Sequence, residues 1–88
     1  MNKSDFEKLG WIFYFEFSDV YEFEKGDVWK EKGQGAFLKW YSNENRIIIT
    51  TTDEGSNMDG PNCSVKYNGR CDSLETYRLV CDLIDFKL

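Results

Sequence analysis

Histidine is absent from this chain of 88 residues, and proline occurs only once. Without histidine the chain lacks the commonest general base and the usual partner of a nucleophilic serine or cysteine. Two carboxylate pairs, Glu22 with Glu24 and Asp82 with Asp85, are expected on exposed faces, where nothing removes them from water. We therefore expect a protein that is not an enzyme and that uses no cofactor.

Cysteine is scarce and gives no ligand pattern. Cys63, Cys71 and Cys81 are odd in number and show no C-x-x-C spacing. They are expected to be reduced thiols that pack as small apolar side chains, which is typical of cytoplasmic proteins. A zinc site would need a carboxylate or a second chain as an additional ligand. Residues 53–62 contain acids and asparagines without the order of a calcium loop, so no metal site is predicted.

Long apolar segments are also missing. No run approaches the roughly 18 residues that a membrane-spanning helix needs, and the first residues lack the apolar stretch of a signal peptide. Hydrophobic residues still make up 41% of the chain and aromatic residues 17%. That is enough for one core, and a chain this short is expected to form a single domain over residues 1–88. A cytoplasmic location without a membrane partner follows.

The net charge of −5 is spread unevenly. Acids outnumber bases in residues 1–31 and 53–62, whereas bases outnumber acids in residues 32–52 and 63–71. A mildly basic sheet in acidic surroundings is one interpretation. Ordinary solubilising charges are the alternative.

Residues 36–52 carry the clearest pattern, reading AFLKWY, then SNEN, then RIIITTT. Aromatic and β-branched runs around a short polar turn are typical of a β-hairpin. Alternation puts on one face Ala36, Leu38, Trp40, Ile47 and Ile49. It puts on the other face Phe37, Lys39, Tyr41, Ile48, Thr50 and Thr52. Because neither face is plainly polar, both require cover or a partner.

Three further segments favour strands. Alternation in residues 11–18 predicts a first strand with one buried face, made of Trp11, Phe13, Phe15 and Phe17. Residues 20–24 form a second strand or the far end of a bent one, and residues 28–30 are candidates to pair back. Residues 53–62 are predicted to be a loop. In the last strand, residues 63–71, the odd-numbered positions point inward and Gly69 marks a bulge or a close contact.

Two helices are indicated by capping boxes. Ser4 with Glu7 starts a short N-terminal turn that Gly10 ends, and Asp72 with Glu75 starts a longer helix. The apolar stripe of the longer helix comprises Leu74, Tyr77, Val80, Cys81 and Ile84, and it is widened by Leu79, Leu83 and Phe86. The predicted class is α+β: an antiparallel meander of four or five strands with a short N-terminal helical turn and one C-terminal helix packed on one face.

The sheet face opposite the C-terminal helix is the predicted functional surface. Its candidate residues are Tyr14, Phe37, Lys39, Tyr41, Ile48, Lys66 and Arg70. Such a face predicts protein binding, either as a homodimer or as an acidic adaptor or inhibitor that occupies a basic groove. The alternative is binding of single-stranded nucleic acid, with bases stacked on the aromatic rings and phosphates near the cations. The net charge and the lack of an RNP-like motif oppose that alternative.

Overall fold

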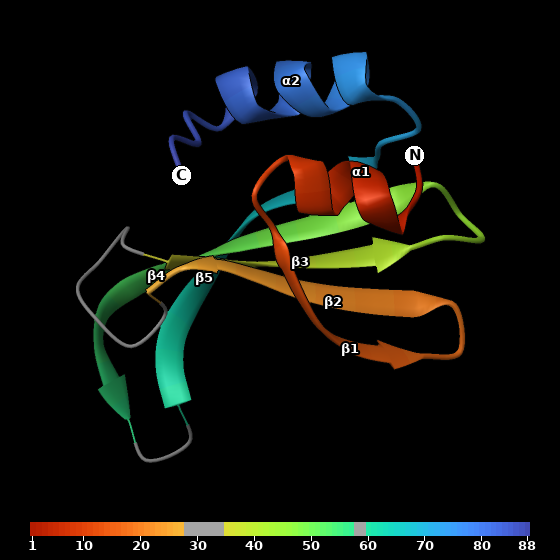
Figure 1. The fold of residues 1–88 in the computed structure, drawn as a ribbon. Helices are drawn as coiled ribbons and strands as arrows, with labels where there is room; N and C mark the ends of the chain where they lie inside the picture. Colours follow the sequence, from red (N-terminus) through yellow and green to blue (C-terminus); the bar gives the residue numbers. More distant parts are fainter. Residues whose placement is uncertain (28–34, 58–59) are drawn as a thin grey trace.

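The protein, described here from a computed structural model, is a two-layer α+β structure (Figure 1). The structure describes residues 1–27, 35–57 and 60–88, and for residues 53–57 and 60–62 it describes the backbone alone. Its elements within these ranges are α1 (Lys3–Lys8), β1 (Ile12–Phe17), β2 (Val20–Gly26), β3 (Gly35–Tyr41), β4 (Arg46–Asn57), β5 (Gly60–Arg70) and α2 (Leu74–Leu83). The strands pair in chain order and all pairs are antiparallel, which confirms the predicted meander.

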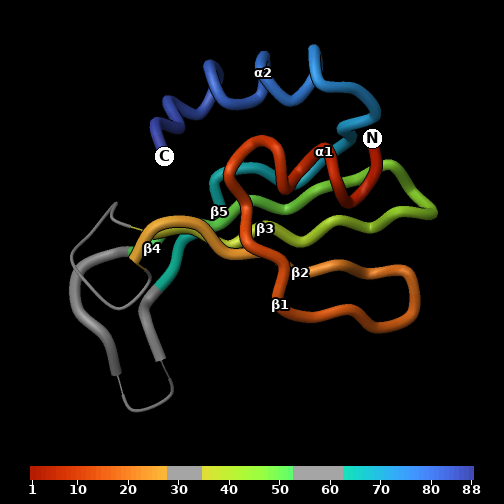
Figure 2. The backbone as a smooth tube through the Cα atoms, in the orientation of Figure 1, coloured from red at the N-terminus to blue at the C-terminus, as the bar shows by residue number. Residues whose placement is uncertain are grey.

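Both helices lie on the same side of the sheet (Figure 2). From α1, the fully buried Phe6 packs on the sheet, with its ring centroid 5.4 Å from that of Phe23 and 5.3 Å from that of Trp40. The N-terminal helix therefore shares the cover of this face with α2.

Trp11 joins the two helical layers just after α1. Its Nε1 donates a buried hydrogen bond of 2.9 Å to the hydroxyl of Tyr77 on α2. Its ring stacks on Phe86 at 5.6 Å between centroids and 2° between planes. A buried indole N–H needs an acceptor, so this bond fixes α2 relative to the chain that enters β1.

The helix caps differ from the predicted ones. The first capping box uses Asn2 and Asp5: the Asn2 side chain accepts from the Asp5 amide at 3.0 Å, and the Asp5 carboxylate accepts from the Asn2 amide at 2.9 Å. For α2 the N-cap is Ser73, whose hydroxyl accepts from the amide of Thr76 at 3.1 Å. Because several cap-forming residues adjoin each helix start, spacing alone shifted both predicted starts.

The turn between β1 and β2 settles whether they are one strand or two. Ser18 and Asp19 both have positive φ, 49° and 67°, as a two-residue type I′ hairpin turn requires. Phe17 and Val20 then face each other as the closing pair. Residues 20–24 therefore belong to a separate second strand.

The connection between β4 and β5 is much shorter than predicted. Pairing continues beyond Thr52 to Ser56 with Pro61 and Asn57 with Gly60, so the prediction of a loop over residues 53–62 is wrong. Turn-forming residues misled that prediction, whereas a proline is tolerated on an edge strand such as β5. The expected pairing of residues 28–30 lies outside the described residues.

The apolar arc of α2 is narrower than predicted. Tyr77 and Val80 are buried, but Leu79 is 64% exposed and Leu83 78% exposed. These two leucines are four residues apart and share a side of α2 that points away from the sheet. The expectation that they widen the buried stripe is therefore wrong.

Replacing Trp40 with alanine tests the assignment of the two sheet faces. Trp40 is 6% exposed and also packs on Tyr21, at 4.8 Å between ring centroids. The cavity left by Trp40→Ala should lower the free energy of unfolding by about 3–5 kcal/mol, measured by urea denaturation. The neighbouring Tyr41→Ala points to the opposite face and should cost about 1 kcal/mol or less. The reverse ranking would mean that the register of β3 is inverted.

Candidate functional site

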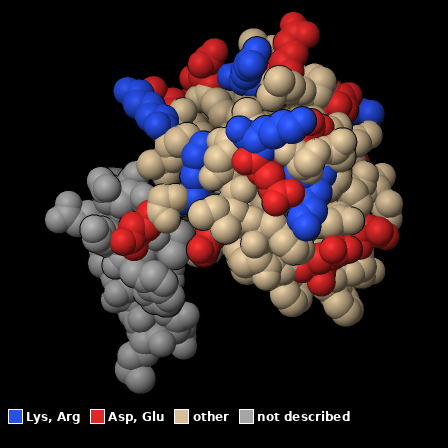
Figure 3. All heavy atoms as spheres, viewed as in Figure 1, with Lys and Arg blue, Asp and Glu red and all other residues tan. Residues whose placement is uncertain are grey.

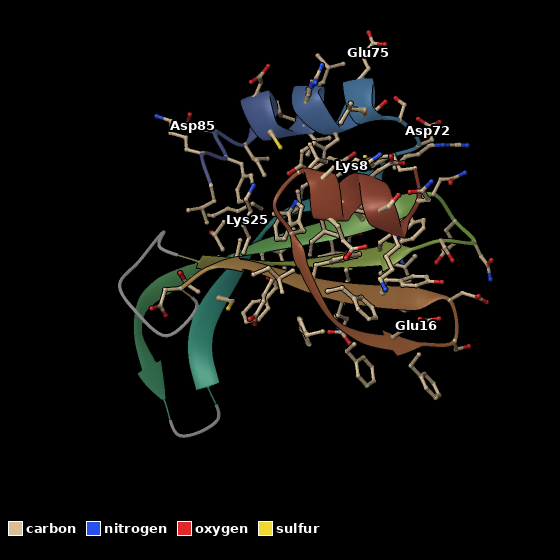
Figure 4. The ribbon with its side chains drawn as sticks, viewed as in Figure 1. Lys8, Glu16, Lys25, Asp72, Glu75 and Asp85 are labelled. Atoms are coloured by element: carbon tan, nitrogen blue, oxygen red, sulfur yellow. The ribbon has the colours of Figure 1, made fainter. Side chains whose placement is uncertain are left out.

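The side of the sheet away from the helices is covered by none of the described segments, and we call it the open face (Figures 1 and 2). Strand register assigns its members, because directly paired residues point to the same side. They include Ile12, Tyr14, Phe15, Phe17, Glu22, Glu24, Phe37, Lys39, Tyr41, Arg46, Ile48, Val65, Asn68 and Arg70. Aromatic side chains extend from β1 away from the helices in Figure 4.

A bulge in β1 supplies aromatic residues that the sequence pattern assigned to the core. Phe13 pairs with Phe23, whereas Phe15 already pairs with Glu22, which leaves Tyr14 as the extra residue. One extra residue moves every later side chain to the other face. Phe15 and Phe17 therefore lie on the open face, 48% and 72% exposed, and their predicted burial is wrong.

A second bulge, in β5, removes one predicted site residue from the open face. Tyr67 pairs with Ile49 and Val65 pairs with Thr50, so Lys66 is extra. Lys66 lines a hollow of about 270 Å³ on the helix side, together with Thr51 and residues 84–88. Its predicted place on the open face is wrong, and Val65, 62% exposed, is there instead.

The structure places the other six predicted site residues on the open face. Tyr14 and Phe37 make an edge-to-face ring contact at 6.4 Å between centroids. Lys39 and Ile48 are directly paired across β3 and β4. The ring centroid of Tyr41 lies 4.5 Å from the guanidinium carbon of the neighbouring Arg46. Arg70, the last of the six, pairs with Arg46 across β4 and β5.

Charge is divided across the open face. The acids Glu22 and Glu24 lie on β2, whereas Lys39, Arg46 and Arg70 lie on β3, β4 and β5. Charged groups of both signs also gather over the helices in Figure 3. The open face thus offers a partner acidic groups on β2 and basic groups on β3 to β5, next to the exposed apolar side chains of the edge strand β1.

Two polar groups of the open face are fixed by their neighbours. The pKa of Tyr14 is raised to about 12, mainly by burial and next by the negative charge of Glu22. The Tyr14 hydroxyl lies 3.4 Å from the Glu22 carboxylate. Tyr14 is therefore a neutral phenol at physiological pH. Arg46 donates to the Asn68 side chain at 3.2 Å and lies 3.6 Å from the Glu44 carboxylate. Both side chains are pre-positioned, which lowers the entropy cost of binding.

The helix side contains a polar cluster whose contacts are structural. Lys25 donates from Nζ to the carbonyl of Leu9 at 2.7 Å, and its ammonium lies 5.7 Å from the ring centroid of Trp11. Burial lowers the pKa of Lys25 and raises the pKa of the Tyr77 hydroxyl. These contacts hold the end of α1 and the start of β1 to the sheet.

Comparisons of the chain with protein-family models, curated proteins and solved structures find no match. Within residues 1–27, 35–57 and 60–88, no three acidic or cysteine side chains gather closely enough to hold a metal ion. Neither helix in those ranges has the length and apolar character needed to cross a bilayer. The open face is thus the feature from which a function is inferred.

The thiols offer a test of the helix-side core. Burial raises the pKa of both Cys71 and Cys81, so little thiolate forms at pH 7.5 to 8, and alkylation by iodoacetamide should be at least about tenfold slower than in the unfolded protein. Cys63 is exposed, so the expectation that it packs as a small apolar side chain is wrong, and it serves as the reference within the same molecule. Equal rates at all three positions, read by mass spectrometry of digests, would contradict the described packing of α2.

Proposed function

We propose that this protein is a small non-enzymatic protein-binding domain whose open face contacts its partner. The observation that carries the proposal is a row of large apolar side chains, 48–72% exposed, on the open side of β1: Ile12, Tyr14, Phe15 and Phe17. Val65, 62% exposed, adds an apolar side chain at the opposite edge of this face, on β5. Contiguous exposed apolar surface is rare on monomers and marks interaction sites. Aromatic residues with arginine at the margin are the composition of interface centres.

The charges favour a partner that also carries both signs. Acidic β2 would face basic groups of the partner, and the bases of β3 to β5 would face acidic groups. A second copy of this chain meets that requirement, and so does a different protein with a mixed surface. If the partner is a different protein, the net charge of −5 favours one that has a basic groove. The chain would then act as an adaptor or an inhibitor that occupies this groove.

Single-stranded nucleic acid is the second candidate. Tyr14, Phe37 and Tyr41 supply rings for base stacking, and Lys39 lies among them. Against it, Lys66 is on the other side of the sheet and Glu22 pairs directly with Lys39. The electrostatic attraction that such binding needs is therefore weak, and protein binding is favoured.

Site-specific photo-crosslinking separates these partners. A photoreactive phenylalanine analogue in place of Tyr41 should yield a discrete product with a protein in cells that express this chain. A product of twice the chain mass would identify a second copy. The same analogue in place of Leu83, on the outer side of α2, is the matched control and should yield none. A nuclease-sensitive product at position 41 would instead favour nucleic acid.

Tyr41→Ala should weaken the association identified in this way by about 1–3 kcal/mol, because a central aromatic side chain is a common hot spot. Sedimentation equilibrium measures self-association, and calorimetry measures binding of a different protein. Leu83→Ala removes an exposed apolar side chain elsewhere and should leave the affinity unchanged. Equal effects of the two substitutions would overturn the assignment of the open face.

A further inference from the structure

The outer edge of β1 is a second feature of the molecule that the open face does not explain. β1 ends the strand order, and no described strand pairs with its outer side (Figure 2). Its sequence IFYFEF has one charged residue, Glu16. An exposed edge strand of this composition is a template for pairing with another strand.

The hairpin turn determines which backbone groups of β1 point outward. A two-residue turn closes on a hydrogen-bonded pair, here Phe17 with Val20. Hydrogen-bonded and non-hydrogen-bonded pairs then alternate along β2, so Glu16 with Tyr21 and Phe13 with Phe23 are of the non-hydrogen-bonded kind. The N–H and C=O groups of Phe13 and Glu16 therefore point to the outer edge.

We propose that β1 pairs antiparallel with β1 of a second copy, with Phe13 of each copy opposite Glu16 of the other. The two-fold axis passes between Tyr14 and Phe15. Both members of each pair then offer outward N–H and C=O groups, which gives two hydrogen-bonded pairs across the axis. The two sheets become one continuous sheet.

The bulge at Tyr14 selects this register. From residue 12 to residue 17 the side chains lie on the open, helix, open, open, helix and open sides, and this order reads the same in both directions. In the proposed register every side chain therefore meets one on its own side of the sheet. In a strand without the bulge, Phe13 and Glu16 would lie on opposite sides and the register would fail.

Charge complementarity supports a second copy as the occupant of the edge. The Lys3 ammonium lies 3.9 Å from the centroid of the Phe13 ring on the helix side. Glu16 of the second copy, opposite Phe13 on that side, arrives next to this ammonium. Among the described residues neither Lys3 nor Glu16 has an ion-pair partner within one chain. The axis generates two such Lys3–Glu16 pairs between the copies.

The pairing also extends the open face. It places Ile12 beside Phe17 of the second copy and Tyr14 beside Phe15 of the second copy. The most exposed aromatic residues of both chains meet at the centre of one surface. The inference goes beyond the proposed function, since it uses the backbone of β1 and helix-side charges, whereas Tyr41 on β3 takes no part.

A charge-swap cycle tests the proposal by sedimentation velocity over a range of concentrations. Lys3→Glu and Glu16→Lys each place like charges together across the axis and should each raise the dimer dissociation constant by about tenfold or more. The double variant restores opposite charges and should return within about threefold of the wild-type value. Lys8→Glu and Glu75→Lys make the same changes in net charge elsewhere, and should have no effect (Figure 4).

A second pair of variants tests the backbone bonds. Glu16→Gln removes the charge and keeps the outward N–H, whereas Glu16→Pro removes both. The proline variant should therefore form a weaker dimer than the glutamine variant. The melting temperatures of the two monomers should be similar. A wild-type chain that remains monomeric up to about 100 µM overturns the proposal, since this range covers weak dimers. The proposal is also overturned if the dimer of the double variant, Lys3→Glu with Glu16→Lys, is as weak as the dimers of the single variants. A dimer weakened by Tyr41→Ala but not by the charge variants would place the contact on the open face alone.

Discussion

The extra residue in β1 is the constraint on which the surface of this protein depends. Side chains in a strand alternate between faces, so one inserted residue moves the rest of the strand to the opposite side. Here it keeps Phe13 on the helix side, next to Lys3, and puts Phe15 and Phe17 on the open face. The bulge thus gives the sheet an aromatic margin. It also makes the order of faces along β1 symmetric, which an unbroken strand of this length cannot be.

One-sided cover of the sheet has a simple origin in the sequence. Both helices are short and each flanks the sheet at a chain end, α1 before β1 and α2 after β5. Trp11 ties them together through its buried hydrogen bond to Tyr77, and Phe6 fills the space over Phe23. Because a buried polar pair is stable only when both members are satisfied, this bond favours both helices on the same face. No described helix is left for the opposite side.

Much of this arrangement could be predicted from residue periodicity. The hairpin of β3 and β4 has strict alternation around a polar turn, and its faces were assigned correctly, with Leu38 and Ile49 in the core. Gly69 was predicted to mark a bulge or a close contact, and the contact is present: a Cβ there would lie 2.7 Å from the Tyr67 hydroxyl. The bulges themselves left no signal. Around Tyr14 apolar residues occur on both sides of the alternation, so either register satisfies the pattern. Around Lys66 the alternation is regular, and the inward orientation that it predicted for Val65 is wrong, because the bulge turns this residue to the open face.

Because the edge and the open face share β1, occupancy of one changes the other. Phe15 and Phe17 are exposed in a single chain, whereas in the proposed pair they adjoin side chains of the second copy. A protein that binds across this junction contacts both copies and has a larger apolar surface than one chain supplies. By thermodynamic linkage, such a protein would strengthen the dimer by the same factor by which dimer formation strengthens its binding. A protein that contacts only β3 to β5 would bind the single chain and the pair equally well.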